Sequence, residues 1–132
     1  MKKLLIFLSL FSILLSYDIK EFVTCKDVKN LTPIEITDTF TTQDKKVYAF
    51  AYFTNIKENR LIDFVWEKEV NGEWKIYADI KLPIYSGIRW RTYSYITIRP
   101  FFKGKWRVSL VDGSETIDTK EFKIIDANLT NK

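Results

Sequence analysis

Arginine and tyrosine recur at every second position in one stretch of the chain, and this spacing offers the clearest chemistry in the sequence. With a period of two, one row between residues 89 and 99 is charged and phenolic, while the other row is mostly apolar. The charged and phenolic row contains Arg89, Arg91, Tyr93, Tyr95 and Arg99. Guanidinium groups stack on aromatic rings and donate forked hydrogen bonds to carboxylates and phosphates. The row is therefore a candidate site for an acidic glycan, a lipid head group or an acidic protein loop.

Two simpler interpretations of this row stay open at the level of sequence. Its arginines can pair across strands with carboxylates of a solvated sheet face, for which the candidates are Glu67, Glu69 and Asp79. Alternatively, Arg91 is partly buried and binds loop carbonyls. Trp74, beside a hairpin tip, is a further candidate binding residue, because an indole at a sheet edge is a platform for a sugar ring. We expect the other tryptophans, Trp66, Trp90 and Trp106, to pack in the core.

Catalysis and metal binding find little support in the composition. Asp63, Glu67 and Glu69 share one strand face, and a pair of carboxylates is the minimum for glycoside hydrolysis, but nothing nearby marks a cleft. The chain has no histidine, which excludes the usual serine and cysteine triads and histidine-ligated zinc. The one cysteine, Cys25, excludes an internal disulfide and is expected to be a small buried side chain, with a reactive or intermolecularly paired thiol as the alternative. We therefore expect no enzyme, no metal and no cofactor.

Alternating segments separated by turn residues predict strands throughout the chain after its first residues. Asn71-Gly72 predicts a tight type I′ hairpin, since both residues accept positive φ. Pro83 and Pro100 are expected to end strands, and Trp74, Ile76, Ala78 and Ile80 to share one face. The predicted strands are 21–28, 46–54, 60–70, 74–82, 89–99, 105–111 and 115–125. The fold class is all-β: an antiparallel two-sheet sandwich of immunoglobulin-like type with seven or eight strands.

The first residues resemble an export signal. Lys2 and Lys3 precede an apolar run, Leu4–Leu15, which is shorter than the about 20 residues that span a membrane. We expect a signal peptide over residues 1–16, cleaved after Ser16, a single domain over 17–125 and a polar tail over 126–132. An uncleaved anchor or a buried N-terminal helix are the alternatives. Without the two lysines the net charge falls from +4 to +2, which gives no strong case for nucleic acid as a partner.

Short motifs spread over most of the chain resemble a bacterial domain-of-unknown-function family, number 2914, found in exported or membrane-linked proteins. The motifs are Asn30…Pro33, Phe40, the strand Tyr48–Thr54, Trp66, Arg89-Trp90-Arg91-Thr92-x-Ser94, Gly104-x-Trp106-x-Val108 and Phe122. Family members often carry a histidine where this chain has Phe64, so no role of that histidine transfers. Because the family has no established activity, the resemblance implies a fold and leaves the function open.

The sequence favours a non-enzymatic module of the periplasm or cell envelope that binds an envelope protein or glycan. The first hypothesis is an accessory domain that binds another protein through the arginine–tyrosine row. The second is a carbohydrate-binding module that uses surface aromatic and arginine side chains. A hydrolase that uses the acidic residues is the least favoured.

Overall fold

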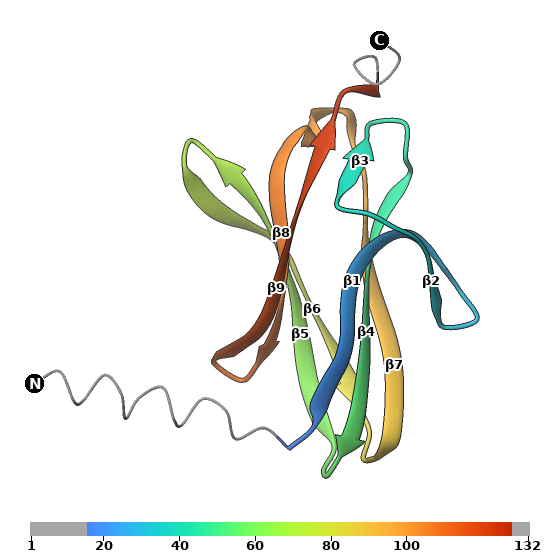
Figure 1. Cartoon of the computed structure of the whole chain (residues 1–132). Coiled ribbons are helices and arrows are strands. Elements are labelled where there is room, and N and C mark those ends of the chain that lie inside the picture. The colour runs from blue at the N-terminus through green and yellow to red at the C-terminus, as the bar shows by residue number, and fades with distance from the viewer. Residues whose placement is uncertain (1–15, 128–132) are drawn as a thin grey trace, which may run out of the picture.

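Two β-sheets face each other (Figure 1) and enclose a cluster of buried apolar side chains. The computed structural model describes residues 16–127, which contain nine strands. Sheet A has the order β2-β1-β4-β7 and sheet B the order β3-β9-β8-β5-β6. Sheet A is built from β1 (Asp18–Lys29), β2 (Thr32–Ile36), β4 (Lys46–Ile56) and β7 (Gly87–Thr97). Sheet B is built from β3 (Thr39–Thr41), β5 (Arg60–Val70), β6 (Glu73–Ile84), β8 (Gly104–Asp112) and β9 (Glu115–Ile125).

The strand order confirms the predicted sandwich of immunoglobulin-like type. Strands β1, β4 and β7 lie opposite β9, β8 and β5, which corresponds to the A-B-E and G-F-C strands of that fold. Two features differ from the prediction. The short strands β2 and β3 were not expected, and β3 pairs with β9 in parallel, not antiparallel. The chain crosses from sheet A to sheet B between Ile36 and Thr39, so β3 arrives beside β9 running in the same direction.

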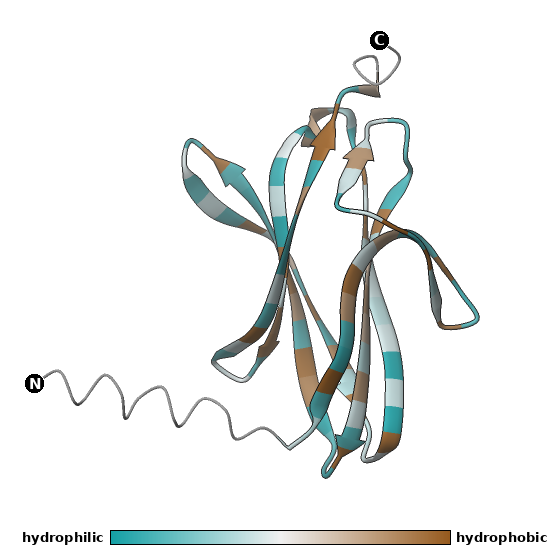
Figure 2. Cartoon of the chain, viewed as in Figure 1, coloured by the Kyte–Doolittle hydropathy of each residue, from teal (hydrophilic) through white to brown (hydrophobic). Residues whose placement is uncertain are grey.

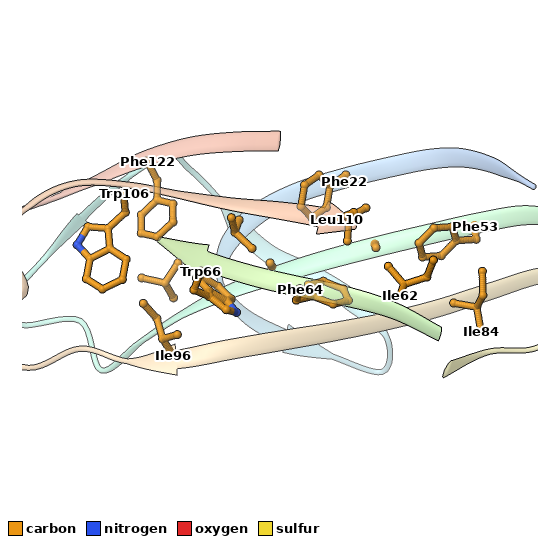
Figure 3. Packing of buried hydrophobic residues seen from close by; sticks show 14 of the residues in the cluster. Phe22, Phe53, Ile62, Phe64, Trp66, Ile84, Ile96, Trp106, Leu110 and Phe122 are labelled. Carbon is orange, nitrogen blue, oxygen red and sulfur yellow. The ribbon is translucent and has the colours of Figure 1, made fainter. Parts of the chain in front are cut away.

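The core confirms the inward rows of the predicted strands. Ile62, Phe64 and Trp66 of β5 are fully buried, as is Trp106 of β8 (Figure 3). Each such side chain stabilises the fold by about 1.5–3 kcal/mol relative to its exposed state. Both indole N–H groups have partners: that of Trp66 donates to Ser94 Oγ at 3.1 Å, and that of Trp106 to the carbonyl of Phe102 at 2.8 Å. The predicted core role is therefore confirmed for these two tryptophans.

Trp90 departs from that pattern because it lies on an edge strand. It packs against the core but is only half-buried, and its ring meets Tyr85 edge to face with centroids 4.9 Å apart. The core role predicted for Trp90 thus holds in part.

Two turn predictions had different outcomes. Asn71 and Gly72 have φ of 53° and 83°, which confirms the type I′ hairpin between β5 and β6. Pro83 does not end its strand, since β6 continues to Ile84. Because β6 is an edge strand, proline there lacks only a donor that would face away from the sheet.

A β-bulge in β6 corrects the predicted faces of that strand. Trp66 lies opposite Ala78, but the next residue, Glu67, lies opposite Ile76, so Tyr77 is inserted between two pairs. Consequently Ile76 and Trp74 lie on the outer face of sheet B. Of the predicted row, only the part from Ala78 onward faces the core. Tyr77 packs instead against Trp106, with ring centroids 5.6 Å apart.

Both ends of the described region are joined to the sandwich. The carbonyl of Ser16 accepts a hydrogen bond from the Lys57 N–H at 2.9 Å. Ala127, inside the predicted polar tail, is buried, and its N–H donates to Thr42 Oγ1 at 3.2 Å. Residues 1–15 of the predicted signal peptide and residues 128–132 of the predicted tail lie outside the described residues. Within 16–127, the structure contains no helix long and apolar enough to cross a membrane.

Candidate functional site

The predicted arginine–tyrosine row lies on the outer face of β7, at the edge of sheet A. Ser94 and Ile96 point into the core, while Tyr93 and Tyr95 are 38% and 43% exposed on the opposite side. Arg89 is exposed and Arg91 half-buried on that same side. Hydrophilic bands therefore alternate along β7 (Figure 2).

The neighbouring strand β4 completes this surface. Arg91 Cζ lies 4.1 Å from the ring centroid of Tyr52, and Lys46 Nζ lies 4.3 Å from that of Tyr95. The ring of Tyr48 lies near those of Tyr95 and Tyr93, with centroids 5.2 and 5.8 Å apart. We call this surface the Arg–Tyr face; it comprises Lys46, Tyr48, Tyr52, Arg89, Arg91, Tyr93 and Tyr95.

Sequence reasoning missed the β4 half of the Arg–Tyr face. Most residues of this strand are apolar on both faces, and this apolar pattern hid its even-numbered row. The available clue was that Lys46, Tyr48 and Tyr52 carry polar tips at alternate positions. Only the pairing of Tyr48 with Tyr95 and of Tyr52 with Arg91 places that row beside β7.

The β1–β2 hairpin projects over this side of sheet A (Figure 1). Its tip residue Leu31 and the β7 residues Arg89, Trp90 and Arg91 line a shallow groove of about 250 Å³. Farther along the same face, Phe50 and Cys25 are 1% and 0% exposed although they point away from the main core. The outer face of sheet A therefore carries a second, small apolar layer, which the sequence did not reveal.

The backbone at the hairpin tip adopts a conformation unusual for its residues. Asn30 and Leu31 have φ of 52° and 53°, the left-handed region. Asparagine enters this region readily, whereas leucine does so at a cost of roughly 1–2 kcal/mol. Leu31 is nonetheless 47% exposed, so it presents an apolar side chain to solvent at the groove.

The cysteine prediction is confirmed in its simpler form. Cys25 is a free thiol and fully buried. Burial raises its pKa to about 11, so the thiol is protonated and unreactive near neutral pH.

Among the described residues, the arginines of sheet B form ion pairs, whereas those of β7 in sheet A do not. Arg60 and Arg107 form ion pairs at 2.8 and 2.7 Å with carboxylates of sheet B. Within residues 16–127, Arg89, Arg91 and Arg99 form no ion pair.

Neither simpler interpretation of the row describes these arginines. The proposed carboxylate partners, among them Glu67 and Asp79, lie on sheet B, and Glu67 pairs with Arg107. Arg91 stacks on Tyr52, and among the described residues it donates to no loop carbonyl. Within the described residues, Arg89 and Arg91 of β7 therefore have no carboxylate partner.

The structure does not bring all six predicted site residues together. Arg89, Arg91, Tyr93 and Tyr95 share the Arg–Tyr face, but Arg99 lies beyond the end of β7, directly before Pro100. Trp74 lies on the outer face of sheet B, where the guanidinium of Arg107 stacks 4.3 Å from its ring centroid. It belongs to a separate stack with Arg107 and Glu67 and is no part of the Arg–Tyr face.

Two members of the predicted acidic row, Asp63 and Glu67, form ion pairs with Lys81 and Arg107. Lys81 Nζ lies 2.7 Å from Asp63 Oδ2, and this hydrogen bond lowers the pKa of Asp63. The neighbouring Asp79 has a raised pKa, mainly because it shares a hydrogen bond with Asp63. Among residues 16–127, no group of three or more histidine, cysteine or acidic side chains could hold a metal ion.

The adjacent residues Phe101 and Phe102 lie in different environments. Phe102 is buried against Trp106, with ring centroids 5.1 Å apart, and anchors the turn (residues 100–102) before β8. Phe101 is 76% exposed. It lies beyond the end of β7, outside the groove at Leu31.

The fold and this surface define an immunoglobulin-like β-sandwich with a basic, tyrosine-rich outer face. Residues 60–124 match the family described as "Protein of unknown function (DUF2914)". This segment, from β5 through nearly all of β9, belongs to that family, which confirms the resemblance expected from the sequence. The match includes the arginine–tyrosine row of β7 but neither the β1–β2 hairpin nor β4.

Comparison with solved structures supports the fold alone. The chain is similar to parts of the beta-glucosidase from Listeria innocua. For the complex with isofagomine the TM-score is 0.52 at 12% identity, covering 83% of this chain and 16% of that one. For the complex with glucose the TM-score is 0.51 at 12% identity, covering 82% and 15%. The chain thus spans about a sixth of that enzyme's length, and no curated protein matches it.

Proposed function

We propose that this protein is an exported, non-catalytic binding module of the bacterial periplasm or cell envelope, whose Arg–Tyr face binds an acidic segment of a partner protein. The observation that carries the proposal is the pair of guanidinium groups, Arg89 and Arg91, without carboxylate partners in the described domain. Arginine on an aromatic surface recurs at protein interfaces because it forms forked bonds to carboxylates and loses little water. Tyr93 and Tyr95 beside it supply rigid, amphipathic contact area.

The packing of the tyrosines favours a protein over a sugar. A sugar ring stacks on an open aromatic face, but the guanidinium of Arg91 covers Tyr52 and the ammonium of Lys46 covers Tyr95. The remaining rings pack against one another, as Tyr48 does against Tyr93. Cations that already stack on aromatic rings are in place to receive carboxylates from above. The carbohydrate-binding hypothesis is therefore our second candidate.

The proposal of a non-catalytic role has two supports. Asp63 and Glu67, the strongest acidic candidates, form ion pairs with Lys81 and Arg107, so both carboxylates already have partners within the domain. The groove at the Arg–Tyr face, about 250 Å³, is smaller than the roughly 300–1,000 Å³ of typical small-molecule sites. It suits a side chain of a partner better than a substrate.

Site-specific photocrosslinking in the producing bacterium tests the proposal. A photoreactive phenylalanine analogue at position 93 is expected to capture a discrete partner, and the Arg89→Glu change is expected to abolish the adduct. The same analogue at Thr119, on sheet B, is the matched control for expression and folding. A partner captured equally from both positions, or an adduct at position 93 that is insensitive to Arg89→Glu, contradicts the assignment of the face.

Export and sugar binding have separate tests. Mass spectrometry of the periplasmic fraction is expected to find a chain that begins at Tyr17; a chain retained in the cytoplasm with residues 1–16 contradicts export. For the second candidate, envelope glycans are titrated against tyrosine and tryptophan fluorescence. A saturable change with neutral sugars would favour carbohydrate over protein as the ligand.

A further inference from the structure

Among residues 16–127, no strand pairs with the outer edge of β7, which is one edge of sheet A. Strand β7 pairs with β4 on one side and ends the strand order on the other. The pairing runs without a register shift from Gly87 to Thr97, and the Ile98 N–H donates to the Lys45 carbonyl at 2.9 Å. In an antiparallel pair, residues whose N–H and C=O groups face the partner alternate with residues whose groups face away. The even-numbered residues of β7 therefore bond to β4, and the odd-numbered residues direct their N–H and C=O groups outward.

The outward-directed backbone groups of β7 and the side chains of the Arg–Tyr face belong to the same residues. Arg89, Arg91, Tyr93 and Tyr95 are odd-numbered, so each presents an unpaired N–H and C=O group at the edge and a side chain on the Arg–Tyr face. A strand added here is hydrogen-bonded to these residues. Its side chains on this face lie about 4.5–5.5 Å from theirs, measured between Cβ atoms.

The other three sheet edges carry features that oppose strand addition, and β7 does not. Strand β2 has five residues, with Pro33 among them and Glu35 at a φ of 56°. Strand β3 has three residues. Strand β6 contains the bulge at Tyr77 and Pro83 near its end. Proteins protect sheet edges by such short strands, prolines and bulges, whereas β7 has 11 residues, no proline and no bulge.

We infer that the partner segment binds as an extended strand along the edge of β7, with acidic side chains opposite Arg89 and Arg91. This inference rests on the proposed function and specifies how the Arg–Tyr face binds. The segment would become the fifth strand of sheet A, its main chain bonded to the odd-numbered residues and its carboxylates to the guanidinium groups. A second copy of β7 fits less well, because Gly87–Thr97 brings two more arginines and no carboxylate.

The groove at Leu31 adds an apolar position to this recognition. Leu31 and Trp90 line it together with the two charged residues, Arg89 and Arg91. A partner strand that places an apolar side chain beside its carboxylates fills the groove, and the exposed Leu31 gains a neighbour. Acidic residues alternating along one face, with a nearby valine or leucine, are the sequence we expect of the partner.

Peptide binding to the full chain tests this mode directly. The probe is a fluorescein-labelled peptide of alternating Glu and Thr, about as long as β7, followed by fluorescence anisotropy at low salt. We expect saturable binding, at least tenfold weaker binding of a Lys–Thr peptide, and a similar loss for Arg89→Glu. Arg89 makes no contact whose loss would unfold the domain, and Lys123→Glu, which changes charge equally on sheet B, should bind normally.

Two measurements separate strand addition from simple charge attraction. Glu–Thr peptides N-methylated at alternate residues keep their charge but lose the donors of one edge; one of the two methylation phases is expected to bind at least tenfold more weakly. Hydrogen exchange should show new protection of the Tyr93 and Tyr95 amides on binding, and no change for Ser94.

The outcomes distinguish the two proposals. Binding that depends on Arg89 but shows neither the methylation effect nor the new protection overturns strand addition and leaves the Arg–Tyr face as the site. If no acidic peptide binds and position 93 captures no partner, both proposals fail. Protection of Tyr93 and Tyr95 that appears with protein concentration alone, without peptide, means that a second copy occupies the edge and also overturns the inference.

Discussion

The left-handed backbone at Leu31 allows a sharp test of the hairpin that overhangs the Arg–Tyr face. Its φ of 53° costs any residue with a Cβ roughly 1–2 kcal/mol, and glycine escapes that cost. Glycine also loses more conformational entropy on folding, which lowers the stability of the protein by about 0.5–1 kcal/mol relative to alanine. Because Leu31→Ala and Leu31→Gly remove the same apolar contacts, their difference isolates the backbone. We expect the glycine variant to be more stable than the alanine variant by about 0.5–1 kcal/mol.

The assay is equilibrium unfolding in urea of both variants and the unchanged protein. The expected difference appears as a higher midpoint with an unchanged slope, and as a melting temperature higher by roughly 2–6 °C. Ile36, exposed on the same hairpin with no positive φ, is the matched control position. There alanine should exceed glycine in stability, since glycine weakens an ordinary strand.

The reversal of order between the two positions is the informative result. Alanine at position 31 as stable as glycine or more so would refute the left-handed conformation and, with it, the strained display of Leu31 at the groove. A glycine variant that matches the unchanged protein in stability but loses peptide binding would show that the leucine side chain serves recognition, since its backbone conformation is then no obstacle to folding.

Three further predictions concern the packing of the domain. Phe50→Ala should destabilise the protein by about 3–5 kcal/mol in urea unfolding, because Phe50 is 1% exposed beneath the hairpin, whereas Phe101→Ala at 76% exposure should change stability by less than about 0.5 kcal/mol; equal effects would argue against the second apolar layer. Burial and the hydrogen bond to Asp112 raise the pKa of Tyr17 far above its ordinary value of about 10, so the stabilisation by the neutral phenol is complete below pH 10 and lost as the pH rises above it; in pH-dependent urea unfolding the stability advantage over Tyr17→Phe should shrink from pH 10 upward, and a constant gap would contradict this. Cys25, whose pKa is raised to about 11, should react with Ellman's reagent at pH 8 far more slowly in the folded protein than in urea, and equal rates would contradict its burial.

Local sequence patterns correctly predicted those features of the fold that depend on a single strand or a single turn. The Asn71-Gly72 turn and the buried row of Trp66 follow from residue type and period alone. The bulge at Tyr77 does not, because it exists only in the pairing of β6 with β5 and reverses the face of Trp74. The candidate site shows the same division: the β7 row was visible in the sequence, while its β4 half depends on which strands become neighbours.

The charge partners were beyond the sequence for the same physical reason. Every arginine of a solvated sheet has plausible acidic partners within the chain, and only the assignment of strands to sheets decides which are in reach. Glu67 was a candidate partner for Arg91 until the fold placed it beside Arg107. The lack of ion pairs at Arg89 and Arg91 within residues 16–127 is therefore a property of the tertiary structure.

The hydrogen bond from the Trp66 indole to Ser94 connects the core to the strand that carries the Arg–Tyr face. Ser94 lies between Tyr93 and Tyr95 on β7, so this bond from an indole of sheet B helps to fix the position of the two phenols on sheet A. This directional bond adds a geometric constraint to the close-packed apolar contacts between the two sheets. A substitution in the core, such as Trp66→Phe, would remove this hydrogen bond and leave Tyr93 and Tyr95 less firmly positioned on the Arg–Tyr face.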